Sequence, residues 1–232
     1  MKTIVTFGEI MGRFCPPGFK RFRQSLPGDL NLTFAGAEAN VAASISMLGG
    51  DARFVTAIPN NDVTQALISN LHGLEVDTSE IVLSKSGRLG LYFVEAGANQ
   101  RPSRVIYDRA YSSVSMTPAS AYDWDSIFDG AGWFHTTGIT PSLSEESAEA
   151  TIQSVKNAKA AGLTVSCDLN FRKKLWKWNP TLSSTELACE TMSRLLPYVD
   201  VVIGNEEDAS DVLGIHAENT DVHSGKIDAS KY

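Results

Sequence analysis

Two tyrosines and an arginine lie in segments that alternate apolar and polar residues. Tyr92 falls in the segment 87–96, whereas Tyr107 and Arg109 fall in the segment 104–109. In an extended strand, residues two apart point to the same face, so Tyr107 and Arg109 share a face. A guanidinium offers a forked pair of donors to a carboxylate, and phenol groups suit hydroxyls. The three residues therefore indicate a site for an acid-bearing sugar, although ordinary surface residues on a half-exposed sheet fit the same pattern.

Small residues dominate the run 34–40 (FAGAEAN), which leads into a predicted helix over 39–48. A helix start without bulky side chains lets a ligand approach its free backbone N–H groups. The amide of Asn40 can then reach a hydroxyl or a carboxylate. Taken alone, the run is better explained by packing, because small residues also let a helix sit close against a sheet.

Polar residues follow two predicted strands where those strands end. Asn170 and Arg172 come after the run 163–169, and Asn205 comes after the run 199–203. Open α/β sheets bind ligands at the carboxyl ends of their strands. Arg172 suits a phosphate or an acid, Asn170 suits a hydroxyl, and Asn205 with the acids after it suits water around a magnesium ion. Helix capping by Asn205 and a solvated Arg172 explain the same residues without a ligand.

The elements that position these residues follow a strand and helix rhythm. The predicted strands are 3–7, 52–58, 133–135, 163–169 and 199–203, and the predicted helices are 39–48, 63–71, 145–161 and 184–196. Such alternation predicts crossover connections, and hence a parallel sheet covered by helices on both faces. The expected fold class is α/β. Within it, His135 and Cys167 are expected to be core residues and not ligands.

Two segments, 14–34 and 87–110, break this rhythm. Both contain alternation of period two, which marks strands with one buried and one wet face. We expect them to form a small antiparallel β lid on one sheet. The α/β core is then expected over 1–13, 35–86 and 111–232, incomplete at its C-terminal end.

Composition excludes several classes of protein. The net charge of −7 disfavours a nucleic-acid binder. Three cysteines without CxxC spacing favour reduced thiols over a disulfide framework or a zinc site. The first residues run directly into a predicted strand, and no apolar stretch approaches the ~18 residues of a membrane span. These features predict a cytoplasmic protein without nucleic-acid or membrane partners.

Taken in order, the motifs resemble the ribokinase-like (PfkB) sugar kinases and, among them, the 2-keto-3-deoxygluconate kinases. The resemblance covers nearly the whole chain. It is carried by Gly36-Ala37-Glu38-Ala39-Asn40, Gly49-Gly50, Gly90-Leu91-Tyr92, Tyr107-Asp108-Arg109, Gly138-Ile139-Thr140-Pro141, Asp168-Leu169-Asn170-Phe171-Arg172 with Leu175-Trp176, and Asn205-Glu206-Glu207-Asp208.

The resemblance implies a ribokinase-like fold and transfer of the γ-phosphate of ATP to the keto acid, with magnesium, giving the 6-phosphate. It implies a sugar site formed by Gly36, Ala37, Asn40, Tyr92, Tyr107, Arg109, the backbone at Ile139, and Arg172. Asn170 and Arg172 would also face nucleotide phosphates, and Asn205 would lie near the phosphate and metal region. Lid sheets of such kinases often pair between subunits, which implies a homodimer or a higher homo-oligomer.

Two features depart from the resemblance. Asp208 stands where the Asn-x-x-Glu pattern has Glu, which shortens the reach to a metal-bound water. The Gly-Ala-Gly-Asp motif, whose Asp is the general base and whose glycines open an anion-stabilising helix start, does not occur in the 232 residues.

The resemblance implies that this base Asp lies beyond Tyr232, the last residue of the sequence. We therefore assign no catalytic residue and no metal ligand. We expect the chain as given to be inactive by itself and to carry the substrate-binding part of a kinase.

Other functions stay open. A kinase for fructose, ribose or a nucleoside fits the same fold, and so does an inactive relative that only holds a sugar acid. A nicotinamide-dependent dehydrogenase is disfavoured, because Gly8-Glu9-Ile10-Met11-Gly12 follows the first strand in place of a G-x-G-x-x-G run. The sequence does not separate gluconate from its galactonate epimer, and it leaves the oligomer size and a role for potassium (K+) open.

Overall fold

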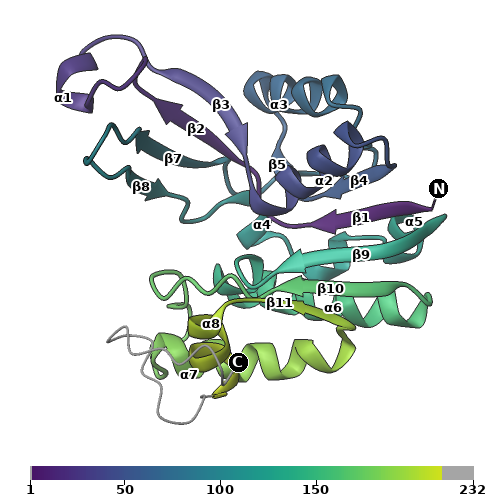
Figure 1. Cartoon of the computed structure of the whole chain (residues 1–232). Coiled ribbons are helices and arrows are strands. Elements are labelled where there is room, and N and C mark those ends of the chain that lie inside the picture. The colour runs from purple at the N-terminus through teal and green to yellow at the C-terminus, as the bar shows by residue number, and fades with distance from the viewer. Residues whose placement is uncertain (1, 216–232) are drawn as a thin grey trace. The chain divides into compact units, whose positions relative to one another are not determined.

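The computed structural model describes residues 2–215, which form two compact units. The first unit contains residues 6–117, and the second contains residues 2–5 together with the residues from 118 onward. Strand β1 (Thr3–Phe7) crosses this division and contributes to both units. Figure 1 labels the helices and strands of each unit.

Parallel strands form the sheet of the second unit. They run in the order β11-β10-β9, and β1 follows β9 in the same order. Their bounds are β9 (Ala131–Thr137), β10 (Thr164–Asp168) and β11 (Val201–Ile203). In register, Ser166 of β10 lies between His135 of β9 and Val201 of β11. Because parallel neighbours cannot be joined by a tight hairpin, each connection needs a crossover.

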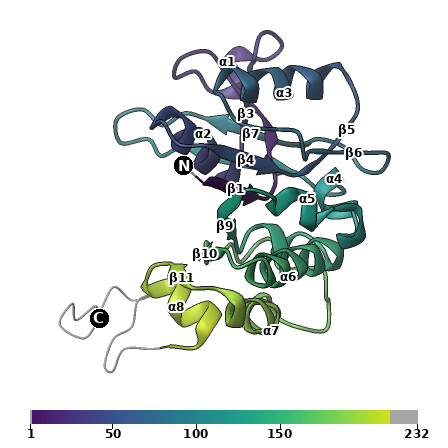
Figure 2. The ribbon, with the colours of Figure 1, turned by 90° about the vertical axis from the view of Figure 1, so that its right-hand side faces the viewer.

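Two serine-capped helices supply these crossovers. Ser144 precedes α6 (Glu145–Ala160), and Ser183 precedes α7 (Ser184–Leu195). Each serine side chain accepts a hydrogen bond from the N–H of the third helical residue, which satisfies one of the free donors of the first turn. Helix α6 packs against β9 and β10 (Figure 2). The helices predicted over 145–161 and 184–196 are confirmed to within one residue.

Shorter helical segments complete the described part of the second unit. Helix α8 follows β11 and packs against α7. The bounds are α5 (Trp124–Phe128), α8 (Glu206–Leu213), and the 3-10 turns η1 (Ala119–Ala121), η2 (Thr140–Ser142) and η3 (Leu196–Tyr198).

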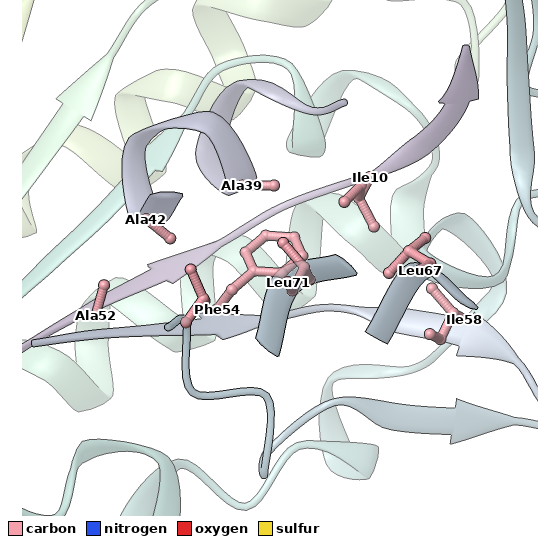
Figure 3. Close-up of a cluster of buried hydrophobic side chains, with 9 residues drawn as sticks. Ile10, Ala39, Ala42, Ala52, Phe54, Ile58, Leu67 and Leu71 are labelled. Atoms are coloured by element: carbon pink, nitrogen blue, oxygen red, sulfur yellow. The ribbon is translucent and has the colours of Figure 1, made fainter. Parts of the chain in front are cut away.

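A cluster of buried apolar side chains organises the first unit (Figure 3). Phe54 lies within it and has no exposed surface. Its residues come in part from α2 (Ala37–Met47), β4 (Ala52–Val55) and α3 (Asp62–Gly73), and the same unit contains the short helix α4 (Ser113–Met116). The cluster consists of Ile10, Ala39, Ala42, Ala52, Phe54, Ile58, Leu67, Leu71 and Val76.

One predicted strand of this unit is two strands in the structure. The run 52–58 divides at Thr56, because β4 lies beside β1 whereas β5 (Ala57–Pro59) pairs in parallel with β6 (Val82–Ser84). The chain therefore changes its pairing partner at Thr56. The run ARFVTAI contains neither glycine nor proline, so the sequence carries no clear mark of such a change.

The predicted small sheet exists as a separate four-stranded sheet in the order β3-β2-β7-β8. Its bounds are β2 (Met11–Cys15), β3 (Asn31–Ala35), β7 (Gly90–Glu95) and β8 (Arg104–Asp108), with helix α1 (Phe22–Ser25) between β2 and β3. The pairs β2–β3 and β7–β8 are antiparallel as predicted. The central pair β2–β7 is parallel, which corrects the expectation of a wholly antiparallel lid.

The parallel pair has a physical reason. Met11 lies opposite Gly90, and the chain between them contains the helices α1, α2 and α3 and the strands β3, β4, β5 and β6, which act as a crossover. The lid over 14–34 and 87–110 was expected to be a domain separate from the core. This stays a prediction, because the two compact units of the structure divide at residue 117.

The predicted core extends to Tyr232, but its last part, 216–232, lies outside the described residues. The expectation that the core is incomplete at this end, with the general base beyond Tyr232, therefore stays a prediction.

His135 and Cys167 are buried, as predicted for core residues. Nδ1 of His135 lies 2.9 Å from Oγ of Ser166, and burial lowers the pKa of His135. Among the described helices, none combines the length and the apolar character that crossing a bilayer requires.

Candidate functional site

Tyr92 and Tyr107 are directly opposite each other on β7 and β8. Directly opposed residues of an antiparallel pair share a face of the sheet. Their ring centroids are 6.0 Å apart with the ring planes at 31°. Tyr107 is 54% exposed, whereas Tyr92 is partly buried and burial raises its pKa. Two phenol groups thus lie side by side, where they can exchange hydrogen bonds with ligand hydroxyls.

Arg109 lies directly after β8 and is held on two sides. Its guanidinium carbon is 5.7 Å from the centroid of the Tyr107 ring, a cation–π distance. Its Nη2 forms an ion pair with Oε2 of Glu9, and the side chains of Arg109 and Glu9 are only 9% and 3% exposed. The structure therefore brings Tyr92, Tyr107 and Arg109 together, and Tyr107 and Arg109 lie beside each other as their two-residue spacing predicted.

Glu9 is the residue of this site that the sequence did not single out. It follows β1, where a single acid after Gly8 gives little signal. Two glycines leave room for it. A Cβ atom on Gly90 would lie 2.7 Å from Oε1 of Glu9, and one on Gly36 would lie 2.0 Å from its backbone oxygen. At Gly36 the clash would be with backbone, so packing around Glu9 requires glycine there, whereas a side chain at Gly90 would displace Oε1 of Glu9.

The run of small residues opens α2, as predicted, but two residues earlier. Gly36 is the N-cap, Ala37 is the first helical residue, and Asn40 lies in the first turn with its side chain exposed. The backbone N–H of Asn40 donates to the carbonyl of Gly36 over 2.8 Å. The packing explanation thus holds for Gly36, and the assignment of these three residues to a sugar site stays a prediction.

In the second unit, Ile139 precedes η2 and its backbone is engaged within the protein. Its N–H donates to Oγ1 of Thr137 over 3.1 Å, and its carbonyl accepts from the N–H of Ser142 over 3.0 Å. The hydroxyl of Ser142 also donates to this carbonyl, so a ligand contact at Ile139 would compete with Ser142 for the carbonyl or with Thr137 for the N–H.

Asn170 and Arg172 lie in the loop after β10, at the carboxyl end of that strand, as predicted. Asn170 has a positive φ of 40°, and its N–H donates to Oδ1 of Asp168 over 3.1 Å. Burial raises the pKa of Asp168, and the nearby Asp208 carboxylate adds to this rise. Arg172 is exposed, and its Nη1 donates to the carbonyl of Phe171. Arg172 therefore presents a guanidinium to solvent.

Asn205 caps α8, which is the role that explains this residue without a ligand. Its side chain accepts from the N–H of Asp208 over 2.9 Å, and Oδ2 of Asp208 accepts from the N–H of Asn205 over 3.2 Å. Oδ1 of Asp208 accepts from the N–H of Phe171 over 3.0 Å. Asp208 is 8% exposed. This carboxylate thus fastens the loop after β10 to the start of α8.

Each oxygen of Asp208 already accepts one backbone hydrogen bond, so a metal ion bound there would use the remaining lone pairs of a carboxylate that also holds two loops. Among residues 2–215, no group of three or more His, Cys, Asp or Glu side chains is placed to hold a metal ion.

Comparison with known proteins identifies the family. The family model described as pfkB family carbohydrate kinase matches residues 1–228. The chain belongs to the pfkB family of carbohydrate kinases. This confirms the resemblance drawn from the ordered motifs.

The pfkB chain is 36% identical over 217 residues to 2-dehydro-3-deoxygalactonokinase of Haloferax volcanii, covering 93% of this chain and 64% of that relative. It is 29% identical over 181 residues to 2-dehydro-3-deoxygluconokinase of Bacillus subtilis, covering 78% and 55%. The crystal structure of 2-dehydro-3-deoxygluconokinase from Thermotoga maritima matches with a TM-score of 0.86 and 44% identity over 97% of this chain and 67% of that one. The chain thus spans about two thirds or less of the length of these relatives.

Proposed function

We propose that the protein is an ATP-dependent sugar-acid kinase that converts 2-keto-3-deoxygluconate (also named 2-dehydro-3-deoxygluconate) to its 6-phosphate. In this proposal the chain carries the substrate-binding part, and the general base lies beyond Tyr232. The observation that carries it is the buried guanidinium of Arg109 beside the paired phenols of Tyr92 and Tyr107. The names of the gluconate and galactonate relatives support an acid sugar.

The chemistry of the three side chains matches a keto acid, which presents one carboxylate and several hydroxyls. Nε of Arg109 is buried without a hydrogen-bond partner among the described residues, and the side chain keeps 9% of its surface exposed, so its guanidinium retains donors for a ligand that enters this site. A hydrogen bond between ionised groups contributes on the order of 1.5–3 kcal/mol. Arg109 therefore reads the acid, and the phenols of Tyr92 and Tyr107 bind hydroxyls.

The remaining sugar contacts of the proposal come from backbone groups, the side-chain amide of Asn40 and a second arginine. The start of α2 offers N–H groups that a helix leaves free in its first turn. These contacts are assigned to Gly36, Ala37, Asn40, Ile139 and Arg172.

We assign the nucleotide phosphates to Asn170, Arg172 and Asn205, which lie in loops at the carboxyl ends of β10 and β11. The exposed guanidinium of Arg172 suits a phosphate because its fork matches phosphate oxygens. When bound with ATP, magnesium neutralises charge on the phosphates and keeps several water ligands. We assign it no direct protein ligand. No residue is assigned to potassium.

The test compares binding of an acid with binding of a neutral sugar. Isothermal titration calorimetry would measure the Kd of 2-keto-3-deoxygluconate and of fructose for the unmodified protein, Arg109→Ala and Arg104→Ala. Arg104 is a matched control, because it is an exposed arginine on the same strand, β8. We expect Arg109→Ala to weaken acid binding by roughly ten- to a hundred-fold and fructose binding far less. Equal losses for both sugars would contradict the assignment of the acid.

One observation favours a second candidate, a kinase for a neutral sugar such as fructose or ribose. The carboxylate of Glu9 already compensates the charge of Arg109. In that case Arg109 has a structural role in the small sheet, and only the phenol groups of Tyr92 and Tyr107 bind the sugar. The titration described above separates the two candidates, because a neutral-sugar kinase binds fructose at least as tightly as the acid.

We also propose a homodimer that forms through the small sheet, in the cytoplasm. Strand β8 ends the order β3-β2-β7-β8, and its residues Val105, Ile106 and Tyr107 are 43%, 46% and 54% exposed. An edge strand with apolar side chains favours pairing with another chain. Light scattering after gel filtration should give the mass of a dimer, and Ile106→Lys should shift it to a monomer. A monomeric unmodified protein would contradict this proposal.

A further inference from the structure

Glu9 carries a charge at a position with almost no access to water. Its side chain is 3% exposed, and a carboxylate in such a place is costly unless it is paired. Among the described residues, its ion-pair partner is Arg109, one hundred positions later in the sequence. The two residues meet only because β2 and β7 pair and bring the end of β8 towards the end of β1.

The place of the Glu9 carboxylate is fixed by the chain around it. Its Oε1 lies against Gly90, where any side chain would collide with it, and its backbone oxygen lies against Gly36. The carboxylate therefore has little freedom to move, and a residue paired with it is fixed as well. Arg109 is further restricted by the Tyr107 ring on the other side.

The pair is incomplete in a specific way. One contact joins Nη2 of Arg109 to Oε2 of Glu9, whereas Nε of Arg109 and Oε1 of Glu9 are buried and have no hydrogen-bond partner among the described residues. An Arg–carboxylate pair with a purely structural role is most stable when two parallel N–H···O hydrogen bonds join the guanidinium to both carboxylate oxygens. Here a donor is left on the guanidinium while its position is set.

We propose that Glu9 is a positioning residue for substrate recognition. It holds the guanidinium of Arg109 by one N–H beside Tyr107 and leaves the remaining donors for the carboxylate of an acid sugar. Glu9 thereby determines the preference for acid over neutral sugars without touching the substrate. This inference rests on the proposed function, in which Arg109 reads the acid.

The test measures the ratio of the affinities for 2-keto-3-deoxygluconate and for fructose. A general loss of protein stability should weaken the binding of both sugars and leave this ratio unchanged. Calorimetric titrations with 2-keto-3-deoxygluconate and fructose would be run on Glu9→Gln and on Glu95→Gln. Glu95 is a matched control, because it is a partly buried acid of the same sheet whose Oε1 accepts from the N–H of Phe22. We expect Glu9→Gln to weaken acid binding roughly ten-fold with little change for fructose, and Glu95→Gln to change neither.

A second variant moves the carboxylate without removing its charge. In Gly90→Ala the new methyl group displaces Oε1 of Glu9, and we expect the same selective loss of acid binding. Melting temperatures would be measured for each variant. If Glu9→Gln does not fold, Gly90→Ala decides the matter alone, and a Gly90→Ala protein with an unchanged affinity ratio overturns the inference.

The failures of the two proposals can be told apart. If Arg109→Ala weakens both sugars equally, the acid-kinase assignment fails, and the role of Glu9 fails with it. If Arg109→Ala weakens only the acid while Glu9→Gln binds the acid as tightly as the unmodified protein or more tightly, only the positioning role is overturned. Tighter binding would mean that Glu9 competes with the substrate carboxylate for Arg109.

Discussion

The carboxylate of Asp208 accepts a hydrogen bond from the backbone N–H of Phe171, 37 residues earlier in the chain. Its other oxygen accepts from the N–H of Asn205, so one buried side chain satisfies two backbone donors. These donors belong to the two strand-end loops to which we assign the nucleotide phosphates. The relative position of Asn170, Arg172 and Asn205 therefore depends on an acid that contacts no ligand in our proposal.

Asp208→Ala should lower the free energy of unfolding by about 1–3 kcal/mol, because the N–H groups of Phe171 and Asn205 lose a charged acceptor in two part-buried hydrogen bonds. Urea denaturation followed by circular dichroism measures this change. Glu207→Ala is the control, since Glu207 is exposed on the same turn of α8 and its loss should cost no more than about 0.5 kcal/mol. Equal effects of the two substitutions would show that Asp208 does not fasten the loops.

Arg109→Lys tests whether the shape of the cation matters. Lysine keeps the positive charge but loses the planar fork that matches a carboxylate. We expect acid binding between that of the unmodified protein and that of Arg109→Ala, as measured by titration with 2-keto-3-deoxygluconate. If Arg109→Lys bound the acid as tightly as the unmodified protein, the positive charge alone would be sufficient. If it bound no better than Arg109→Ala, the stacking of the guanidinium on Tyr107 would be required.

Phe54→Ala should destabilise the first unit strongly. Phe54 has no exposed surface and lies within the apolar cluster of Figure 3. Truncation of a buried phenylalanine costs about 3–5 kcal/mol, through lost burial and the cavity that remains. Leu48→Ala is the control, because Leu48 is 89% exposed. A comparable loss of unfolding free energy in both variants would argue against this cluster as the core.

His135 predicts a dependence of stability on pH. Burial lowers its pKa in the folded protein below the ordinary value of 6.5, so the unfolded chain binds a proton at higher pH than the folded one does. The contribution is fully present above pH ~6.5 and is lost as the pH falls through this value, with a slope of at most ~1.4 kcal/mol per pH unit. His135→Gln should flatten the curve of unfolding free energy between pH ~7.5 and ~5.5, whereas His72→Gln should leave the His135 contribution in place. An unchanged slope in His135→Gln would contradict this assignment.

The sequence predicted much of this fold because the relevant signals are local. The capping serines before α6 and α7 and the apolar runs of β9 and β10 lie next to the elements they define. The start of α2 was placed two residues late, because Glu38 interrupts the apolar pattern although it is buried in the structure.

What the sequence did not predict depends on partners far apart in the chain. Alternating residues fix which face of a strand is buried but not the direction of its neighbour, so the parallel pairing of β2 with β7 carries no local mark. In the candidate site, the spacing of Tyr107 and Arg109 predicted their contact correctly. Glu9 was missed because a single acid after a strand gives little signal until the chain a hundred residues later supplies its partner.

The parallel central pair of the small sheet has a consequence for the order of folding. Strands β2 and β3, and likewise β7 and β8, are close in sequence and can meet early, since short loops close at low entropic cost. Met11 and Gly90 pair only after 78 intervening residues have been brought into place. Contacts of such wide sequence separation slow folding. We therefore expect two separate hairpins to form first and to join late, with the contact between Glu9 and Arg109 completed last.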